Sequence, residues 1–156
     1  ASHRAWMQQL PKGIIMTPHP KELDRLVGNT CTNSYERLMK ASELAERLQA
    51  YIILKGHYSA LCLPDGNVIF NPTGNSGMAT AGSGDVLSGI LAAVLCMYLK
   101  TEEQPPMVLK AALGVYLHGL CGDLAAAEKG KRSMLAGDII EYLPKALAIG
   151  EEESGL

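Results

Sequence analysis

Apolar positions along the chain alternate between short continuous runs and longer stretches with helical spacing. Short runs lie at 13–16 (GIIM) and 51–54 (YIIL), and each ends where polar residues, glycine or proline follow. Continuous apolar runs of this length are typical of strands buried on both faces. We therefore predict two buried strands of a parallel sheet with helices between and after them.

Helical spacing follows each of these runs. The segment 17–27 (TPHPKELDRLV) opens a helix, with Pro20 in the first turn, where its missing N–H costs nothing, and Glu22 near the end that favours negative charge. A second helix is predicted over 34–49, with Ser34 as its cap. Further helices are predicted over 84–100, 107 to about 129, and 136–148, and we expect the acidic tail from about 149 to 156 to fray.

A hairpin is predicted between the second strand and the later helices. Segments 59–63 and 68–71 flank Pro64-Asp65-Gly66-Asn67, a strong turn signal. The order of elements is two strand–helix alternations, a hairpin and then stacked helices. This order predicts an α/β sheet covered by helices, in a single domain over residues 1–156.

Composition narrows the class of protein. The chain has 156 residues, of which 47% are hydrophobic and 19% charged, which suits one folded domain with one core. Its net charge is −2 and its basic residues are scattered, so we expect no nucleic-acid partner. The most apolar run, 86–99, has 14 residues, fewer than the about 20 that span a bilayer, so we expect no membrane partner.

The cysteines indicate a reducing compartment. They are widely spaced and form no C-x-x-C pair, so a zinc site is not expected and a disulfide framework is unnecessary. We predict a cytoplasmic protein. The four residues are Cys31, Cys62, Cys96 and Cys121.

The segment with the clearest chemistry is 71–89 (NPTGNSGMATAGSGDVLSG), between a strand and an apolar helix. A glycine-rich loop that leads into a helix exposes N–H groups and partial positive charge, which favour a bound anion. A carboxylate at this place would repel a phosphate, so the presence of Asp85 indicates a chemical role. It could act, for example, as a base toward a substrate hydroxyl. The alternative is that Asp85 only caps the helix. We predict a phosphate-handling active site.

The same loop carries a family resemblance. TAGSGDVLSGI at 80–90 resembles the anion-hole motif of ribokinase-like kinases, and the longer string at 71–93 is similar to the ADP- or ATP-dependent NAD(P)H-hydrate dehydratases. The resemblance extends from about Gly13 to Ala148. Its other landmarks, in order, are TPHPKEL at 17–23, ILKGHYS at 53–59, GVYLHGLCGDLA at 114–125 and AGDIIEYLP at 136–144.

This resemblance implies a fold and an activity. The fold would be a layered α/β/α domain with a mostly parallel sheet plus a hairpin, of which this chain would be the C-terminal part. The activity would be that of a carbon–oxygen lyase for metabolite repair, which phosphorylates the ring hydroxyl of NAD(P)H hydrate and eliminates phosphate to restore NAD(P)H. The resemblance also implies ADP or ATP as co-substrate, Mg²⁺, a homo-oligomer, and a possible fused or partner epimerase.

Individual roles follow from the same resemblance. Asp85 would contact the substrate hydroxyl and act as base, His19 would contact the substrate, and Glu22 would help to organise Mg²⁺. The implied nucleotide-binding residues are Lys55, Gly56, His57, Tyr58, Ser59, Asn75, Thr80, Ala81, Gly82, Ser83 and Gly84.

Simpler roles remain open for several of these residues. His19 lies between two prolines and could be a rigid turn residue, Glu22 could only balance the helix dipole, and Lys55 could be a solvated lysine. We expect His118 to be a hydrogen-bonded core histidine and Met78 to line the site.

Two other functions remain open. One is a ribokinase-like small-molecule kinase that acts on a vitamin precursor or a sugar. The other is an inactive nucleotide-binding fragment. The string at 71–93 favours the dehydratase.

Overall fold

The computed structural model describes residues 4–99 and 104–154. It divides into two compact units, an N-terminal unit that ends at Phe70 and a C-terminal unit that begins at Asn71. Each unit has its own buried core. The single domain expected from the sequence remains a prediction.

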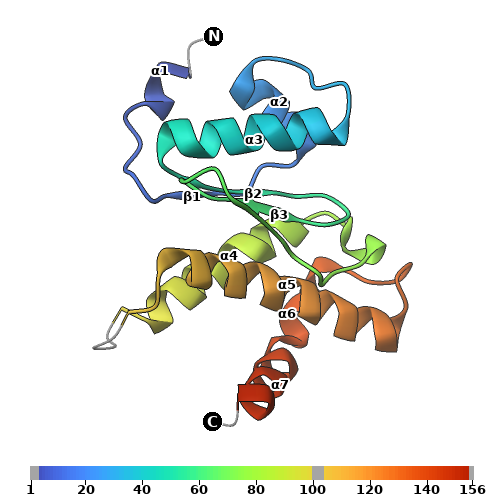
Figure 1. Ribbon diagram of the computed structural model, residues 1–156. Coiled ribbons are helices and arrows are strands. Elements are labelled where there is room, and N and C mark those ends of the chain that lie inside the picture. Colours follow the sequence, from blue (N-terminus) through green and yellow to red (C-terminus); the bar gives the residue numbers. More distant parts are fainter. Residues whose placement is uncertain (1–3, 100–103, 155–156) are drawn as a thin grey trace. The chain divides into compact units, whose positions relative to one another are not determined.

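The N-terminal unit is a four-stranded sheet with helices on one face (Figure 1). Helices α2 and α3 pack together and α3 packs on β2, around buried Leu23, Leu44 and Ile52. The α/β class predicted from the sequence is confirmed. The elements of this unit are α1 (Arg4–Met7), β1 (Ile15–Met16), α2 (Pro20–Val27), α3 (Ser34–Leu48), β2 (Tyr51–Leu54), β3 (Ala60–Cys62) and β4 (Val68–Phe70).

The described sheet is mixed, in a chain that was expected to be the C-terminal part of a domain with a mostly parallel sheet plus a hairpin. Its order is β1-β2-β3-β4, in which β1 pairs parallel with β2 and the other two pairings are antiparallel. Only residues 55–59 connect β2 to β3, and a parallel crossover needs a dozen or more residues. The predicted hairpin joins β3 to β4, and its turn is closed by the Leu63 N–H, which donates to the Asn67 carbonyl at 2.9 Å.

The C-terminal unit is helical, and its central element is α5. Helix α5 packs against α4, α6 and α7, and its residues Val115, Cys121 and Ala125 are buried. By length and composition alone α5 could cross a membrane, but this burial makes it the core helix of the unit. The elements are the 3₁₀ helix η1 (Ser76–Met78), α4 (Ser83–Met97), α5 (Met107–Lys129), α6 (Ala136–Glu141) and α7 (Leu143–Ser154).

The end of the chain differs from the single helix predicted over 136–148. The helix is interrupted at Tyr142, which separates α6 from α7, and α7 continues to Ser154. The tail that was expected to fray is therefore helical as far as Ser154, and residues 155–156 lie outside the described part. Lys129 joins α5 to α6, since its ammonium lies 2.6 Å from Asp138 Oδ1 and 2.5 Å from Glu141 Oε2.

The cap of α3 also differs from the prediction. Asn33, not Ser34, is the N-cap, with extended backbone (φ −149°, ψ 172°) and its Oδ1 accepting from the Glu36 N–H at 2.8 Å. Glu36 in turn accepts from the Thr32 N–H and hydroxyl, at 2.8 and 2.7 Å. The extended backbone that a cap requires is reached one residue earlier than the helical spacing suggested.

We therefore expect Asn33→Ala to lower the free energy of unfolding by about 1 kcal/mol, because the first turn of α3 loses its side-chain acceptor. Ser34→Ala is the matched control and should change it by less than about 0.5 kcal/mol. Urea unfolding followed by circular dichroism measures both values. A larger loss in Ser34→Ala than in Asn33→Ala would show that the cap is Ser34.

Candidate functional site

The glycine-rich loop ends in a turn that only glycine adopts readily. Gly82 is the N-cap of α4 and has left-handed backbone (φ 87°, ψ −13°). A Cβ atom at this position would also lie 3.2 Å from the Cβ of Ala136. The chain can therefore turn into α4 here without strain only because residue 82 has no side chain.

Several N–H groups at this turn have no acceptor. Those of Ala81, Gly82 and Gly84 donate to no other group in the described part of the chain, whereas Ser83 donates to the Thr80 carbonyl at 3.3 Å. The positive end of the α4 dipole lies at the same place. Three free donors beside a helix N-terminus form a suitable cradle for an anion such as a phosphoryl group.

Asp85 lies in the first turn of α4 with an exposed carboxylate. This carboxylate has no hydrogen-bond or ion-pair partner among the described residues, while the Asp85 N–H donates to the Gly82 carbonyl at 3.0 Å. A capping role would require the carboxylate to accept from the free N–H groups at the start of the helix. The geometry therefore leaves Asp85 available to a ligand rather than committed to the helix.

Helix α5 holds the loop in place through polar contacts. The Asp123 carboxylate accepts from the Gly74 N–H at 2.8 Å and from Asn75 Nδ2 at 2.9 Å, and Asn75 Nδ2 also donates to the Gly122 carbonyl. The Thr73 hydroxyl donates to the Tyr116 carbonyl at 2.9 Å. The Asn75 side chain is thus engaged in holding the loop, and its predicted contact with nucleotide remains a prediction.

Two glycines of α5 allow this close approach. A Cβ at Gly119 would lie 2.2 Å from Thr73 Oγ1, and one at Gly122 would lie 2.3 Å from Met78 Sδ. Sequence reasoning missed this function of Gly119, Gly122 and Asp123. The signal was present in the landmark at 114–125, where the two glycines are three residues apart and therefore share one face of a helix.

Two other predictions about this unit have different outcomes. His118 is a hydrogen-bonded, partly buried histidine as expected, with Nε2 3.0 Å from the Ser83 carbonyl oxygen. Met78 packs against the buried core of the C-terminal unit and against α5. Its expected position along the ligand site remains a prediction.

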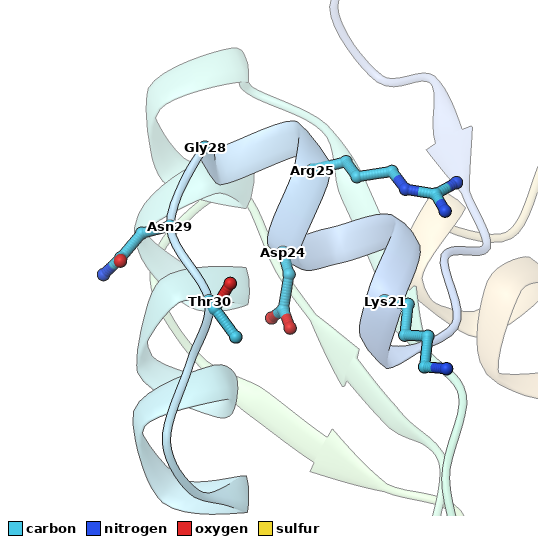
Figure 2. A pocket seen from close by; sticks show the side chains of 6 residues that line it. All are labelled: Lys21, Asp24, Arg25, Gly28, Asn29 and Thr30. Atoms are coloured by element: carbon cyan, nitrogen blue, oxygen red, sulfur yellow. The ribbon is translucent and has the colours of Figure 1, made fainter.

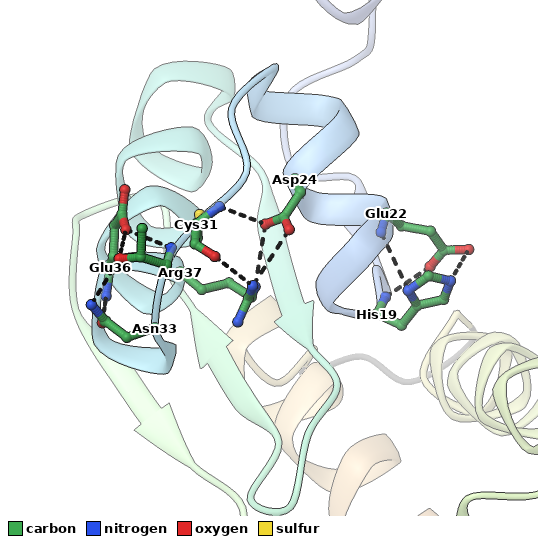
Figure 3. Close-up of polar contacts among 8 residues, drawn as sticks. His19, Glu22, Asp24, Cys31, Asn33, Glu36 and Arg37 are labelled. Carbon is green, nitrogen blue, oxygen red and sulfur yellow. Dashed lines mark hydrogen bonds and ion pairs between the residues drawn. The ribbon is translucent and has the colours of Figure 1, made fainter.

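In the N-terminal unit, His19, Glu22 and Lys55 lie close together (Figure 3 shows the first two). The Glu22 N–H donates to His19 Nδ1 at 3.2 Å, and the His19 N–H donates to Glu22 Oε2 at 2.7 Å, which forms a reciprocal capping box at the start of α2. The Lys55 ammonium lies 4.0 Å from the same Glu22 oxygen. His19 and Glu22 therefore have a structural role, because they cap the start of α2. Both side chains are still about half exposed.

Glu22 is the residue to which Mg²⁺ was assigned, and its carboxylate is already engaged. Glu22 Oε2 already accepts a hydrogen bond, and the nearby ammonium of Lys55 opposes a second cation. Over residues 4–99 and 104–154, no group of three or more His, Cys, Asp or Glu side chains could hold a metal ion. The assignment of Mg²⁺ to Glu22 remains a prediction.

A hollow of about 330 Å³ lies beside the loop that follows β2. Lys55, Gly56, His57 and Tyr58 all line it, together with the aromatic rings of Tyr35 and Phe70. Tyr35, Tyr58 and Phe70 are exposed by 73%, 63% and 58%. Aromatic faces and an ammonium suit a planar base linked to phosphates. Ser59 is not among the lining residues.

Similarity to a solved structure identifies the fold of this chain. A ribokinase-like superfamily protein from Enterococcus faecalis aligns with 93% of this chain and 49% of its own, at 29% identity and a TM-score of 0.69. The chain is thus a ribokinase-like α/β protein, as expected. A family model described as NAD(P)H-hydrate dehydratase matches residues 1–145, and the chain belongs to that family.

Two relatives are similar over most of the chain. The bifunctional NAD(P)H-hydrate repair enzyme Nnr of Moorella thermoacetica is 48% identical over 141 residues, which are 90% of this chain and 26% of that protein. The ADP/ATP-dependent NAD(P)H-hydrate dehydratase of Bacillus subtilis, co-crystallized with ATP/Mg²⁺, has 34% identity and a TM-score of 0.79. That alignment covers 89% of this chain and 50% of the Bacillus chain. The chain therefore spans between a quarter and a half of these relatives.

We expect Gly119→Ala to lower the free energy of unfolding by about 1–3 kcal/mol, because its methyl group would overlap Thr73. Gly89→Ala is the matched control, since nothing lies within 4 Å of its Cβ and alanine favours a helix. Gly89→Ala should raise the free energy of unfolding by up to about 1 kcal/mol. Chemical denaturation measures both, and equal effects would contradict the close packing of the loop on α5.

Proposed function

We propose that the protein uses an adenine nucleotide to dehydrate NAD(P)H hydrate and so restores NAD(P)H. The observation that carries the proposal is the free Asp85 carboxylate beside the unbonded N–H groups of Ala81, Gly82 and Gly84. Phosphoryl transfer needs such a base next to donors that stabilise the transferring group. The family match covers this loop, and it favours the dehydratase over an ordinary kinase or an inactive nucleotide-binding fragment.

The first chemical step is a phosphoryl transfer. The ring hydroxyl of the hydrate attacks the terminal phosphorus of ADP or ATP, Asp85 takes the hydroxyl proton, and the bond from phosphorus to the departing nucleotide breaks. The free N–H groups of the loop hold the phosphoryl oxygens as their charge is redistributed. The products are AMP or ADP and a phosphate ester of the hydrate.

The second step is an elimination. The bond between the ring carbon and the ester oxygen breaks, inorganic phosphate leaves with the electron pair, and the neighbouring ring carbon loses a proton to form the double bond. The phosphate is a far better leaving group than hydroxide, which is why nucleotide is consumed. No electrons are transferred to or from the cofactor overall.

The N-terminal unit supplies the other proposed contacts. Lys55 and Tyr58 line a hollow that suits an adenine base, and His19 has a half-exposed ring that suits contact with the dinucleotide. Mg²⁺ would arrive with the nucleotide phosphates and contribute charge neutralisation. The Bacillus relative was co-crystallized with ATP/Mg²⁺, which supports this pairing.

The cellular setting is part of the proposal. All four cysteines are free, and Cys31, Cys62 and Cys121 are buried, which supports a reducing, cytoplasmic compartment. Burial raises the pKa of the Cys62 and Cys121 thiols to about 11, so neither is a reactive thiolate. The Moorella relative is named as bifunctional, which supports a fused or partner epimerase. We also propose a homo-oligomer.

We expect Asp85→Asn in the full-length protein to lower turnover by about 10²- to 10⁴-fold, because the hydroxyl proton loses its acceptor. Nucleotide affinity should change little, since the N–H groups of the loop remain. The assay follows the absorbance of NADH as it is regenerated from NADH hydrate with ADP or ATP, and calorimetry measures nucleotide binding.

Asp65→Asn is the control for this variant, since Asp65 is an exposed carboxylate in the hairpin turn of the N-terminal unit. It should keep normal turnover. Equal loss of turnover and of nucleotide affinity in Asp85→Asn would make Asp85 a binding or structural residue. No regeneration of NADH by the unaltered protein would contradict the proposed reaction itself.

A further inference from the structure

We propose that the outer side of α2 carries a second anion site, which takes the phosphate or pyrophosphate group of a ligand. It lies in the N-terminal unit, in an open hollow of about 430 Å³ (Figure 2). The hollow stands apart from the glycine-rich loop in the sequence and is lined by residues of the N-terminal unit alone. Its lining residues are Lys21, Asp24, Arg25, Gly28, Asn29 and Thr30.

Two cations without partners line this hollow. Lys21 and Arg25 are one helical turn apart and extend to the same side of α2 in Figure 2. Both are exposed, and neither forms a hydrogen bond or ion pair with another described residue. Like charges at this spacing repel, and Lys21 also lies at the end of α2 that disfavours positive charge. Both costs would be removed by a bound anion.

The single carboxylate of the hollow does not cancel this charge. Asp24 pairs with Arg37, with Oδ1 3.2 Å from Nε and Oδ2 3.4 Å from Nη2 (Figure 3). This hydrogen-bonded guanidinium lowers the pKa of Asp24 below its ordinary value. The charges of Asp24 and Arg37 therefore balance each other, and those of Lys21 and Arg25 remain. Glu22, the neighbouring acid on α2, is engaged by His19 and lies near Lys55.

Uncharged donors complete the lining. In Figure 2, Asn29 and Thr30 follow α2 on the side of Asp24 away from the two cations. Their side chains are exposed and form no hydrogen bond with any described residue. Their position is held by the left-handed turn at Gly28 (φ 71°), where the N–H groups of Gly28 and Asn29 donate to the Asp24 carbonyl at 2.8 and 3.1 Å. The ammonium and the guanidinium, on one side of the hollow, suit phosphate oxygens, whereas the amide and the hydroxyl lie across Asp24 from them.

The test is a titration of the ¹⁵N-labelled full chain with inorganic pyrophosphate at constant ionic strength, followed by amide chemical shifts. We expect saturable shifts at residues 21–30, and at least a tenfold weaker dissociation constant in Lys21→Ala/Arg25→Ala. Lys12→Ala, which removes an exposed lysine outside the hollow, should leave the constant unchanged. Arg25→Lys should lose less affinity than Arg25→Ala because the charge remains.

Two results would overturn the site: shifts at residues 21–30 that do not saturate, or an affinity that the double variant and Lys12→Ala lower equally. Shifts at residues 80–85 report separately on the glycine-rich loop, so failure of one site is distinguishable from failure of the other. NADPH, NADH and inorganic phosphate distinguish the source of the anion. Binding that is weakened in Lys21→Ala/Arg25→Ala and is tighter for either dinucleotide than for phosphate identifies a dinucleotide ligand of this hollow, and the reverse order identifies a free anion.

Discussion

The candidate site depends on one carboxylate, that of Asp123 on α5. It accepts hydrogen bonds from the Gly74 N–H and the Asn75 side chain, and so fixes a loop that contains little regular structure of its own. A glycine-rich segment loses much conformational entropy when it is ordered, and charge-assisted hydrogen bonds of this kind offset that cost. Gly119 and Gly122 complete the attachment because they let the loop backbone reach the helix.

Fixing the loop determines the chemistry that the C-terminal unit can perform. Donors that are already in position need no reorganisation when charge moves in a transition state, and this is the main electrostatic contribution of such sites. The N–H groups of Ala81, Gly82 and Gly84 meet that condition, with Asp85 in the first turn of α4. Substitutions on α5, distant in sequence from the loop, should therefore act on the same site.

Helix α2 of the N-terminal unit carries both paired and unpaired charges. His19 and Glu22 satisfy each other at its start, and Asp24 ties it to α3 through Arg37. These pairs leave Lys21 and Arg25 as its unpaired charges among the described residues. Arg25 lies in the last turn of α2, where the helix dipole favours positive charge, whereas Lys21 lies in the first turn, where the dipole disfavours it.

The sequence by itself determined the elements whose signals are local. Apolar runs and helical spacing located β2, α4 and α5, and Pro20 with Glu22 located the start of α2. Turn residues located the hairpin, and glycines followed by Asp85 located the candidate anion cradle. Only the tertiary structure decided what holds that cradle, because Asp123 and Gly74 are 49 positions apart and no local pattern links them. It likewise decided that Asn33 caps α3 and that the described sheet is mixed, since backbone angles and strand pairing depend on neighbours in space.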